Sequence, residues 1–360
     1  MSTFWHENWD QVRGHFVKWW KREGMVFTVT ARKNTPWEDI PAPAAPKSLE
    51  ERWLDPVYRV KRDIYAMSRS YFGGDAYPSM DIDVGPGSLG SFIGSEPALS
   101  LDTVWFHTNI TDPDTHPELC FDPHDPHNKW FKVHTDLLDE AMRQCRGRYV
   151  VGLPDLIENV DTLAQLRGAQ TLMVDMIERP RWVEQRVAQI NRVYYNAFDE
   201  LAKHVRQPWG GNAFAAFRIW GPGRTAKLQC DASAMFSADM YRRFVMPALT
   251  EQCRWLDSSL YHLDGTQAMH HLDALLEIDA LDAIEWTPQA GIEGGGHPRW
   301  YPMYKKIIAA GKGVQAVGVR PEELKPLLDA CGSDGMYIAS RVDSEAEARR
   351  MVDVAEKYRR

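Results

Sequence analysis

The sequence lacks three features that would place a protein in a specialised class. It has no run of about eighteen apolar residues, so it predicts no transmembrane helix. Its five cysteines are odd in number and show no C-x-x-C spacing, which argues against a disulfide framework and against a zinc ribbon. It has 42 lysines and arginines against 50 aspartates and glutamates, and this net charge of −8 disfavours binding to nucleic-acid phosphates.

The N-terminal segment also lacks the apolar core of a secretory signal, because charged residues are spread through residues 1–24. Together with the reduced cysteines, this predicts a cytoplasmic protein without membrane association. What the chain does have is an ordinary share of hydrophobic residues, 44 %, and a high number of tryptophans, 14. So many large flat side chains make an aromatic-walled pocket an expected feature.

Short strand patterns and amphipathic helix patterns alternate along most of the chain. The candidate strands are 25–30, 80–84, 149–153, 227–231, 259–264, 283–287, 313–317 and 336–340. The candidate helices are 182–205, 237–257, 268–278, 299–311, 321–332 and 344–360, three of which begin at the capping or first-turn residues Ser237, Pro321 and Ser344. Eight strands with intervening helices predict an α/β fold, a (β/α)8 TIM barrel, although counting alone does not exclude a doubly wound sheet.

Two further segments qualify this expectation. A ninth candidate strand, 213–220, implies that one of the nine is a hairpin arm or an error. Residues 85–135 are rich in Gly, Pro, Asp and His and predict long loops over the C-terminal mouth of the barrel. Because no repeat, low-complexity tract or linker divides the chain, we expect a single domain over residues 1–360, with an N-terminal extension.

Two motifs invite a functional interpretation that their context does not favour. Residues 85–90, GPGSLG, fit the glycine pattern of a dinucleotide loop, but a proline at the second position, no clear following helix and no later acidic strand end argue against a Rossmann site. Residues 112–134 contain His116, His124, His127 and His134 among aspartates. Their spacing does not match a zinc site, so turns capped by aspartate side chains are the favoured interpretation.

The stretch SSLYHLDG, residues 258–265, ends an apolar strand in His262 and Asp264. Two residues apart on a strand means the same face, so both side chains point to one place. On the next predicted strand, Glu285 is expected beside them, at the strand end where α/β proteins place their chemistry. Such a group predicts a hard-ligand divalent metal site or, without metal, acid–base chemistry. A hydrogen-bonded strand end, with Gly265 in the turn, is the non-functional alternative.

Other strand ends carry polar residues that would face the same mouth. Asp231 follows KLQC, Asp155 follows VVGLP, and Ser340 and Arg341 end the last strand. Arg341 offers a cation for a carboxylate or a phosphate. For each residue alone an ion-paired or capping role is as good an explanation, but the repeated pattern favours a site.

A series of segments resembles the uroporphyrinogen decarboxylase superfamily. In order they are GLPDL, LRG, DMIERPRWVEQRV, CDASAMFSADMYRRFVMP, YHLDG, LDAIEWTPQAG and GVRPEEL. The resemblance covers about residues 148–350, whereas residues 1–75 match weakly. It implies a (β/α)8 barrel, and the superfamily contains both cofactor-free decarboxylases and corrinoid-linked methyltransferases.

The resemblance is closer to the methyltransferase-like branch, because the MRQAGR-like motif of the decarboxylases is absent from VFTVTARKNTPWEDIP. In that branch a His-x-Cys pair and a cysteine on the last strand are expected. His262 matches the histidine, Asp264 stands in place of the first cysteine, and Ser340 or Arg341 in place of the second. In the more distant cobalamin-independent methionine synthases a glutamate joins the zinc shell, at about the position of Glu285.

The expected function is therefore a methyltransferase that moves a methyl group from a small O- or N-methylated substrate to a corrinoid-binding partner protein. Zinc or another divalent metal is the expected ion, and carboxylates in place of thiolates make its site harder. The expected residues are His262, Asp264 and Asp231 for catalysis; Asp155, Trp286 and Arg341 for substrate binding; and His262, Asp264 and Glu285 for the metal. A cofactor-free decarboxylase or lyase for a small carboxylic acid and a non-catalytic ligand-binding barrel remain the alternatives.

Overall fold

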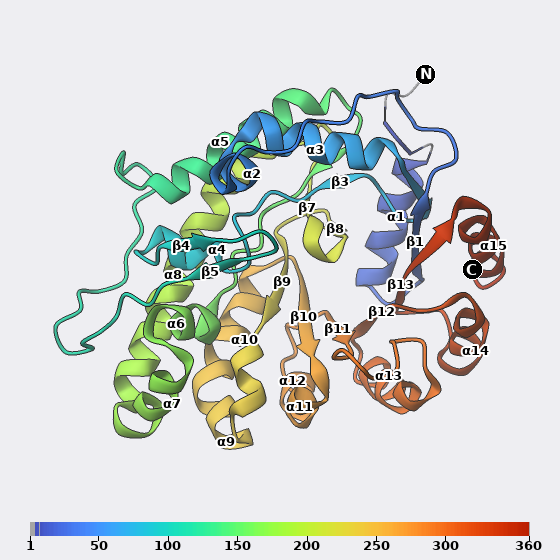
Figure 1. Cartoon of the computed structure of the whole chain (residues 1–360). Helices are drawn as coiled ribbons and strands as arrows, with labels where there is room; N and C mark the ends of the chain where they lie inside the picture. The colour runs from blue at the N-terminus through green and yellow to red at the C-terminus, as the bar shows by residue number, and fades with distance from the viewer. Residues whose placement is uncertain (1–3, 7, 360) are drawn as a thin grey trace.

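A computed structural model of the chain describes residues 4–6 and 8–359. Its centre is a seven-stranded sheet with the order β2-β1-β13-β12-β11-β10-β9 (Figure 1). All neighbouring strands of this sheet are parallel except β2, which pairs antiparallel with β1. The bounds are β1 (Val26–Arg32), β2 (Ser70–Gly74), β9 (Thr225–Gln229), β10 (Ser258–Asp264), β11 (Ala283–Thr287), β12 (Gly313–Val317) and β13 (Met336–Ser344).

The remaining strands form three separate pairs. They are β3 (Ser79–Met80) with β6 (Val150–Val151), β4 (Pro97–Leu99) with β5 (Val104–Phe106), and β7 (Asn212–Phe214) with β8 (Ile219–Gly221). The β7–β8 hairpin accounts for the ninth strand candidate, so the expectation that one candidate is a hairpin arm is confirmed. All eight predicted strand positions overlap a strand, but 80–84 does so only at Met80 and 149–153 only at Val150–Val151.

The central sheet is not closed among the described residues, because β2 and β9 form its two edges. The segments predicted to complete a barrel, 80–84 and 149–153, pair with each other over two residues each, and beyond this ladder Leu153 forms one isolated bridge with Phe214. The structure therefore shows a mixed α/β fold with a largely parallel sheet, and the closed eight-stranded barrel is not confirmed.

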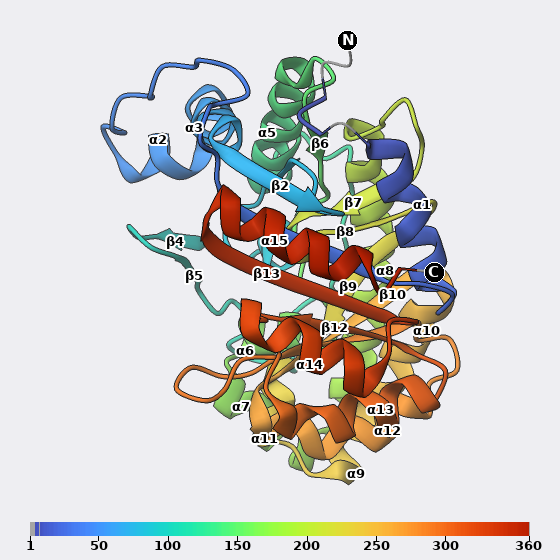
Figure 2. The same ribbon diagram turned by 90° about the vertical axis from the view of Figure 1, so that its right-hand side faces the viewer.

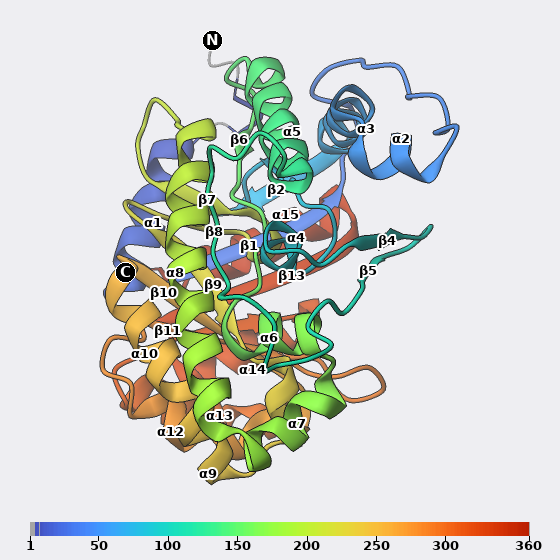
Figure 3. The same ribbon diagram turned by 90° about the vertical axis from the view of Figure 1, so that its left-hand side faces the viewer.

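Helices cover the outside of this sheet. Figure 2 shows α13, α14 and α15 in front of β12 and β13, and Figure 3 shows the long helix α8 on another side of the molecule. The bounds in the second half are α8 (Pro180–His204), α9 (Ala238–Met240), α10 (Met246–Trp255), α11 (Gly265–Ala268), α12 (Leu272–Leu276), α13 (Tyr301–Ala309), α14 (Pro321–Cys331) and α15 (Glu345–Glu356). Earlier helices are α1 (Trp9–Trp20), α2 (Leu49–Leu54), α3 (Pro56–Ser68), α4 (Ser88–Phe92), α5 (Lys129–Cys145), α6 (Asn159–Arg167) and α7 (Ala169–Glu178).

The predicted helix starts are confirmed by their capping contacts. The hydroxyl of Ser237 accepts a hydrogen bond from the backbone N–H of Met240, and Ser344 accepts one from Glu347. Each bond satisfies one of the amides that the first turn of a helix leaves without a partner. Within the described part of the chain, no helix combines the length and apolarity needed to cross a bilayer.

The segment predicted as long loops, 85–135, contains more regular structure than expected, namely α4, the β4–β5 hairpin and the start of α5. Its aspartates behave as predicted: the backbone N–H groups of His124 and His127 donate to the side chains of Asp122 and Asp125. His134 is buried in α5, and burial lowers the pKa of its imidazole to about 4.

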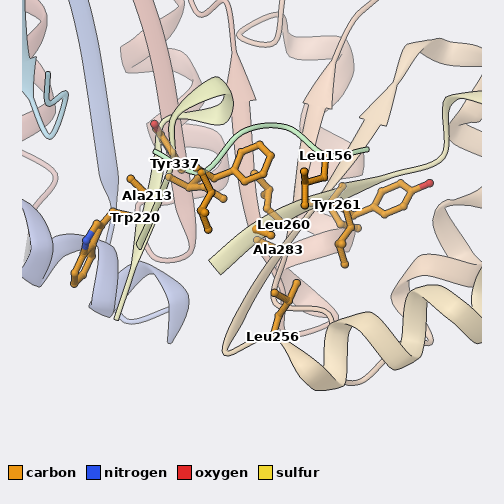
Figure 4. Close-up of a cluster of buried hydrophobic side chains, with 14 of the residues drawn as sticks. Leu156, Ala213, Trp220, Leu256, Leu260, Tyr261, Ala283 and Tyr337 are labelled. Atoms are coloured by element: carbon orange, nitrogen blue, oxygen red, sulfur yellow. The ribbon is translucent and has the colours of Figure 1, made fainter. Parts of the chain in front are cut away.

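The apolar residues form one connected core that joins the N-terminal helix to the sheet. Figure 4 shows part of it, in which Leu260, Ala283 and Tyr337 from the sheet gather with Trp220 from β8. From α1, the indole N–H of Trp19 donates to the carbonyl of Gly335, and that of Trp20 donates to the carbonyl of Trp220. The tryptophans of α1 therefore serve the core of the fold rather than a pocket.

A buried carboxylate connects the two ends of the chain. The side chain of Asp75, 2 % exposed, lies 2.6 Å from Nδ1 of His15 in α1 and 2.6 Å from Nη2 of Arg359. It also accepts the backbone N–H of Phe27, in β1, at 2.8 Å. Removing this carboxylate leaves the buried amide of Phe27 without its acceptor and takes from Arg359 one of its two acidic partners, the other being Glu356.

We expect Asp75→Ala to lower the free energy of unfolding by about 3 kcal/mol, since the buried amide of Phe27 loses its acceptor and the side chains of His15 and Arg359 lose a buried charged partner. Urea unfolding followed by tryptophan fluorescence measures the change. The matched control is Asp10→Ala, because the Asp10 side chain is 91 % exposed in its pair with Arg13. Equal effects of the two substitutions would show that the Asp75 contacts do not stabilise the fold.

Candidate functional site

The register of three parallel strands places His262 between two polar neighbours. On β10, His262 lies opposite Glu285 of β11 and opposite Gln229 of β9. Nδ1 of His262 is hydrogen-bonded to Glu285, whose other oxygen accepts the hydroxyl of Thr287. Burial acts to lower the pKa of His262, but the hydrogen bond to Glu285 and its charge outweigh it, so the net shift of the pKa is upward.

His262 also belongs to a group of three potential metal ligands. One side-chain donor atom each from Asp231, His262 and Asp264 lies within 4.8 Å of the other two. Because Nδ1 of His262 faces Glu285, Nε2 is the nitrogen that remains for a ligand. Three protein donors that leave other positions open are typical of catalytic metal sites, and one nitrogen with carboxylate oxygens suits a hard divalent ion.

The structure thus brings together two of the three predicted ligands, His262 and Asp264, and adds Asp231 in place of Glu285. Glu285 lies behind the imidazole, where it fixes the orientation of the ring instead of sharing its ligand face. The reason is the register: directly opposite residues on neighbouring strands lie side by side, so the carboxylate meets the nearer nitrogen of the ring.

Asp231 is held by a network of its own. The amide of Gln229 donates to Asp231 and to Asp161, and Asp161 accepts the backbone N–H groups of Asp231 and Ala232. Desolvation by the surrounding protein and the negative charge of Asp161 raise the pKa of Asp231 to about 6. Its carboxyl group can therefore exchange a proton close to neutral pH.

A buried lysine, which the sequence interpretation missed, lies under this network. The side chain of Lys227 is fully buried, and Nζ lies 2.8 Å from a carboxylate oxygen of Asp155. Asp155, predicted to bind substrate, is thus the ion-pair partner of Lys227. The signal was present in the sequence, since a lysine inside the otherwise buried strand β9 needs a buried partner.

Two further carboxylates extend the polar row at the end of β3. Burial raises the pKa of both Asp81 and Asp83. One oxygen of Asp81 has no hydrogen-bond partner in the part of the chain that the structure describes. Asp81 and Asp83 are two ionisable side chains two residues apart at a strand end, which is the same pattern as that of His262 and Asp264. The sequence interpretation did not use it.

A cavity of about 340 Å³ lies beside His262. Its lining combines strand-end residues with the tip of the β7–β8 hairpin, and consists of Ala216, Phe217, Arg218, His262, Glu285, Thr287, Gln315, Val317, Gly318, Ala339, Ser340 and Arg341. The ring of Phe217 stands edge-on to His262 at 5.0 Å between centroids. Of the residues predicted to bind substrate, Arg341 is part of this lining.

Trp286 is placed elsewhere. It follows Glu285 on β11, so its side chain points to the opposite face of the sheet. It is fully buried and packs against Trp300 with 4.8 Å between ring centroids. The structure therefore puts this tryptophan in the core instead of the cavity wall.

Comparison with known proteins gives a match among solved structures. No model of a protein family matches the chain, and no curated protein sequence matches it either. Among solved structures, the chain is similar to a methyltransferase from Methanosarcina mazei, with a TM-score of 0.62 and 11 % sequence identity. The match covers 96 % of this chain and 98 % of the other. At this identity it shows a shared fold, and the predicted uroporphyrinogen decarboxylase superfamily is not confirmed.

Glu158, next to the site, makes folding stability depend on pH. It is buried, accepts the backbone N–H of Gln229, and has its pKa raised by burial to about 8. Because its pKa in the folded state lies above the ordinary value, its stabilising contribution is complete below pH 4.5 and decreases as the pH rises towards 8.

We expect Glu158→Gln, which keeps the acceptor oxygen, to remove this dependence. The difference in melting temperature between the wild type and the variant should decrease as the pH rises from about 5 to about 8. This decrease corresponds to a loss of a few kcal/mol in the free energy of unfolding of the wild type. Thermal unfolding across this range measures it, with the exposed Glu178→Gln as control. Parallel pH profiles for wild type and Glu158→Gln would contradict the raised pKa.

Proposed function

We propose that this protein is a methyltransferase that takes a methyl group from a small O- or N-methylated substrate in the cavity beside His262. The observation that carries the proposal is the group of Asp231, His262 and Asp264, whose histidine also lines that cavity. The fold shared with a methyltransferase from Methanosarcina mazei supports the reaction class. The acceptor, following the sequence resemblance, is a corrinoid carried by a partner protein.

The proposal includes a barrel-like architecture of the uroporphyrinogen decarboxylase type. It is supported by the parallel bridge between Leu153, after β6, and Phe214, at the end of β7. This bridge, together with the contacts of β7 and β9, connects the short β3–β6 pair to an edge of the central sheet. The polar residues at the ends of β3, β6, β9, β10 and β11 would then face one mouth.

The chemistry requires stabilisation of the leaving heteroatom. When a methyl group departs from oxygen or nitrogen without its bonding electrons, the heteroatom keeps the pair and needs a proton or a positive charge. His262, with its raised pKa and with Glu285 behind Nδ1, is suited to donate a proton from Nε2. Alternatively, a divalent metal held by Asp231, Nε2 of His262 and Asp264, zinc being the first candidate, would take the place of this proton and supply Lewis acidity there.

A cofactor-free decarboxylase or lyase is the second candidate. Two observations favour it: the pKa of Asp231 is raised to about 6, and the buried ammonium group of Lys227 lies in the same network. A carboxyl group that titrates near neutral pH can act as a general acid or base without a metal.

Metal binding separates direct ligands from supporting residues. We expect the metal-free protein to bind one Co²⁺ per chain, seen in its visible absorption spectrum, and His262→Ala and Asp264→Ala to abolish it. Glu285→Gln should weaken binding only about 10- to 100-fold, as is usual for a residue that orients a ligand.

The matched control for this titration is His204→Ala, which removes a histidine from an exposed pair with Asp139. If Glu285→Gln abolished binding as completely as His262→Ala, Glu285 would be a direct ligand, as the sequence predicted. If the wild type bound no Co²⁺, the metal-dependent mechanism would be excluded.

Methyl transfer itself is measured with methyl ethers and methylamines as donors and free cob(I)alamin, kept reduced, as the acceptor. We expect a change in corrinoid absorbance with wild type and a loss of rate of about 100-fold or more in His262→Ala. Release of carbon dioxide from a small acid by metal-free protein, without a corrinoid, would instead favour the second candidate.

A further inference from the structure

A second cavity, of about 550 Å³, adjoins the one beside His262. The two share Arg218, on the β7–β8 hairpin, and Arg341, on β13, as lining residues. The second cavity is also lined by Arg32, at the end of β1, and by Arg69, at the end of α3. Four arginines therefore line these two neighbouring cavities in a chain whose net charge is −8.

Arg32, Arg218 and Arg341 are exposed to solvent, and protein carboxylates compensate their charges poorly. Within the described part of the chain, no ion pair joins Arg32, Arg218 or Arg341 to a carboxylate, and Arg69 reaches only the fully exposed Asp39, at 3.9 Å. Asp343 is the one acidic residue in the described lining of the second cavity. Away from these two cavities, other exposed arginines have a close carboxylate partner. Arg243, for example, lies 2.7 Å from Glu184.

The backbone of Arg218 is held in place by the fold. Its φ of 55° lies in the left-handed region, which costs a residue with a side chain roughly 1–2 kcal/mol. Hydrogen bonds from two strands fix this conformation: Gln315 donates to the carbonyl of Phe217 at 3.0 Å, and the hydroxyl of Tyr337 donates to the carbonyl of Arg218 at 2.9 Å. Gln315 and Tyr337 therefore hold the hairpin tip that carries Arg218 beside the cavity.

Between the arginines and His262, the wall of the first cavity offers more polar groups. Gln315 and Ser340 are 2 % and 3 % exposed, and both line this cavity. Oε1 of Gln315 and Oγ of Ser340 have no hydrogen-bond partner among the described residues. These two side chains make the wall next to His262 polar.

We propose that Arg218 and Arg341 form an oxyanion subsite, so that the substrate carries a carboxylate or a phosphate in addition to its methylated heteroatom. This inference rests on the proposed function for the methylated end, whereas the anionic end follows from the arginines themselves. Guanidinium groups bind both oxyanions through paired N–H donors. Since the same cavity contains His262, one small molecule can occupy the subsite and present its heteroatom to the imidazole.

Three probes of similar shape test the subsite by isothermal titration calorimetry: para-methoxybenzoate, para-methoxyphenyl phosphate and the neutral para-methoxybenzamide. We expect at least one anionic probe to bind in the millimolar range or tighter, and the amide not to bind. Arg341→Gln and Arg218→Gln should each weaken anion binding about tenfold or more. The control is Arg243→Gln, which should have no effect on anion binding. Arg243 is exposed and lies on the π-helical turn Tyr241–Val245, before α10.

Preference for the phosphate or for the carboxylate would support the subsite and identify the oxyanion. Equal binding of the amide, unchanged affinity in both arginine variants, or no saturable binding of either anion would overturn it. The subsite and the proposed function fail separately: Co²⁺ binding should be unchanged in Arg341→Gln and Arg218→Gln. Anion binding should persist in His262→Ala, even if no methyl transfer is found.

Discussion

The parallel pairing of β9, β10 and β11 in a single register is the constraint on which the candidate site depends. It places His262 beside Glu285 on one strand and beside Gln229 on the other. A slip by one residue would turn His262 to the opposite face and present the apolar Leu263 instead. The hydrophobic core opposes such a slip, because Leu263 and Trp286 are buried on that opposite face.

The polar network at the strand ends is compensated internally. Lys227 is fully buried but has Asp155 as its partner, and Gln229 separates Asp161 from Asp231 by donating to both. Such pairing allows several ionisable groups to lie close together at a tolerable free energy. Arg218 and Arg341, which line the cavity, differ because their charges have no comparable protein partner. The network of Lys227 is therefore complete within the protein, whereas the two arginines are available to a ligand.

Much of the fold followed from local patterns. Hydrophobic patterning located six of the eight predicted strands over most of their length, the other two (80–84 and 149–153) only in part, and the six predicted helices. The helix caps Ser237 and Ser344 formed as expected. Closure of the sheet did not follow from them. The segments around β3 and β6 read as ordinary strands, yet each forms a ladder of only two residues. Periodicity measures which face of a strand is buried and contains no information about how many residues pair with a distant strand.

The same division applies to the site. The sequence by itself determined that His262 and Asp264 share a face and that Glu285 ends the following strand, because these relations depend on spacing within a strand. Only the tertiary structure decided that Glu285 supports the imidazole, that Asp231 joins the ligand group, and that Trp286 belongs to the core. These outcomes depend on inter-strand register and on loops that approach from far along the chain. Both are set by packing of the whole molecule, which no short stretch of sequence encodes.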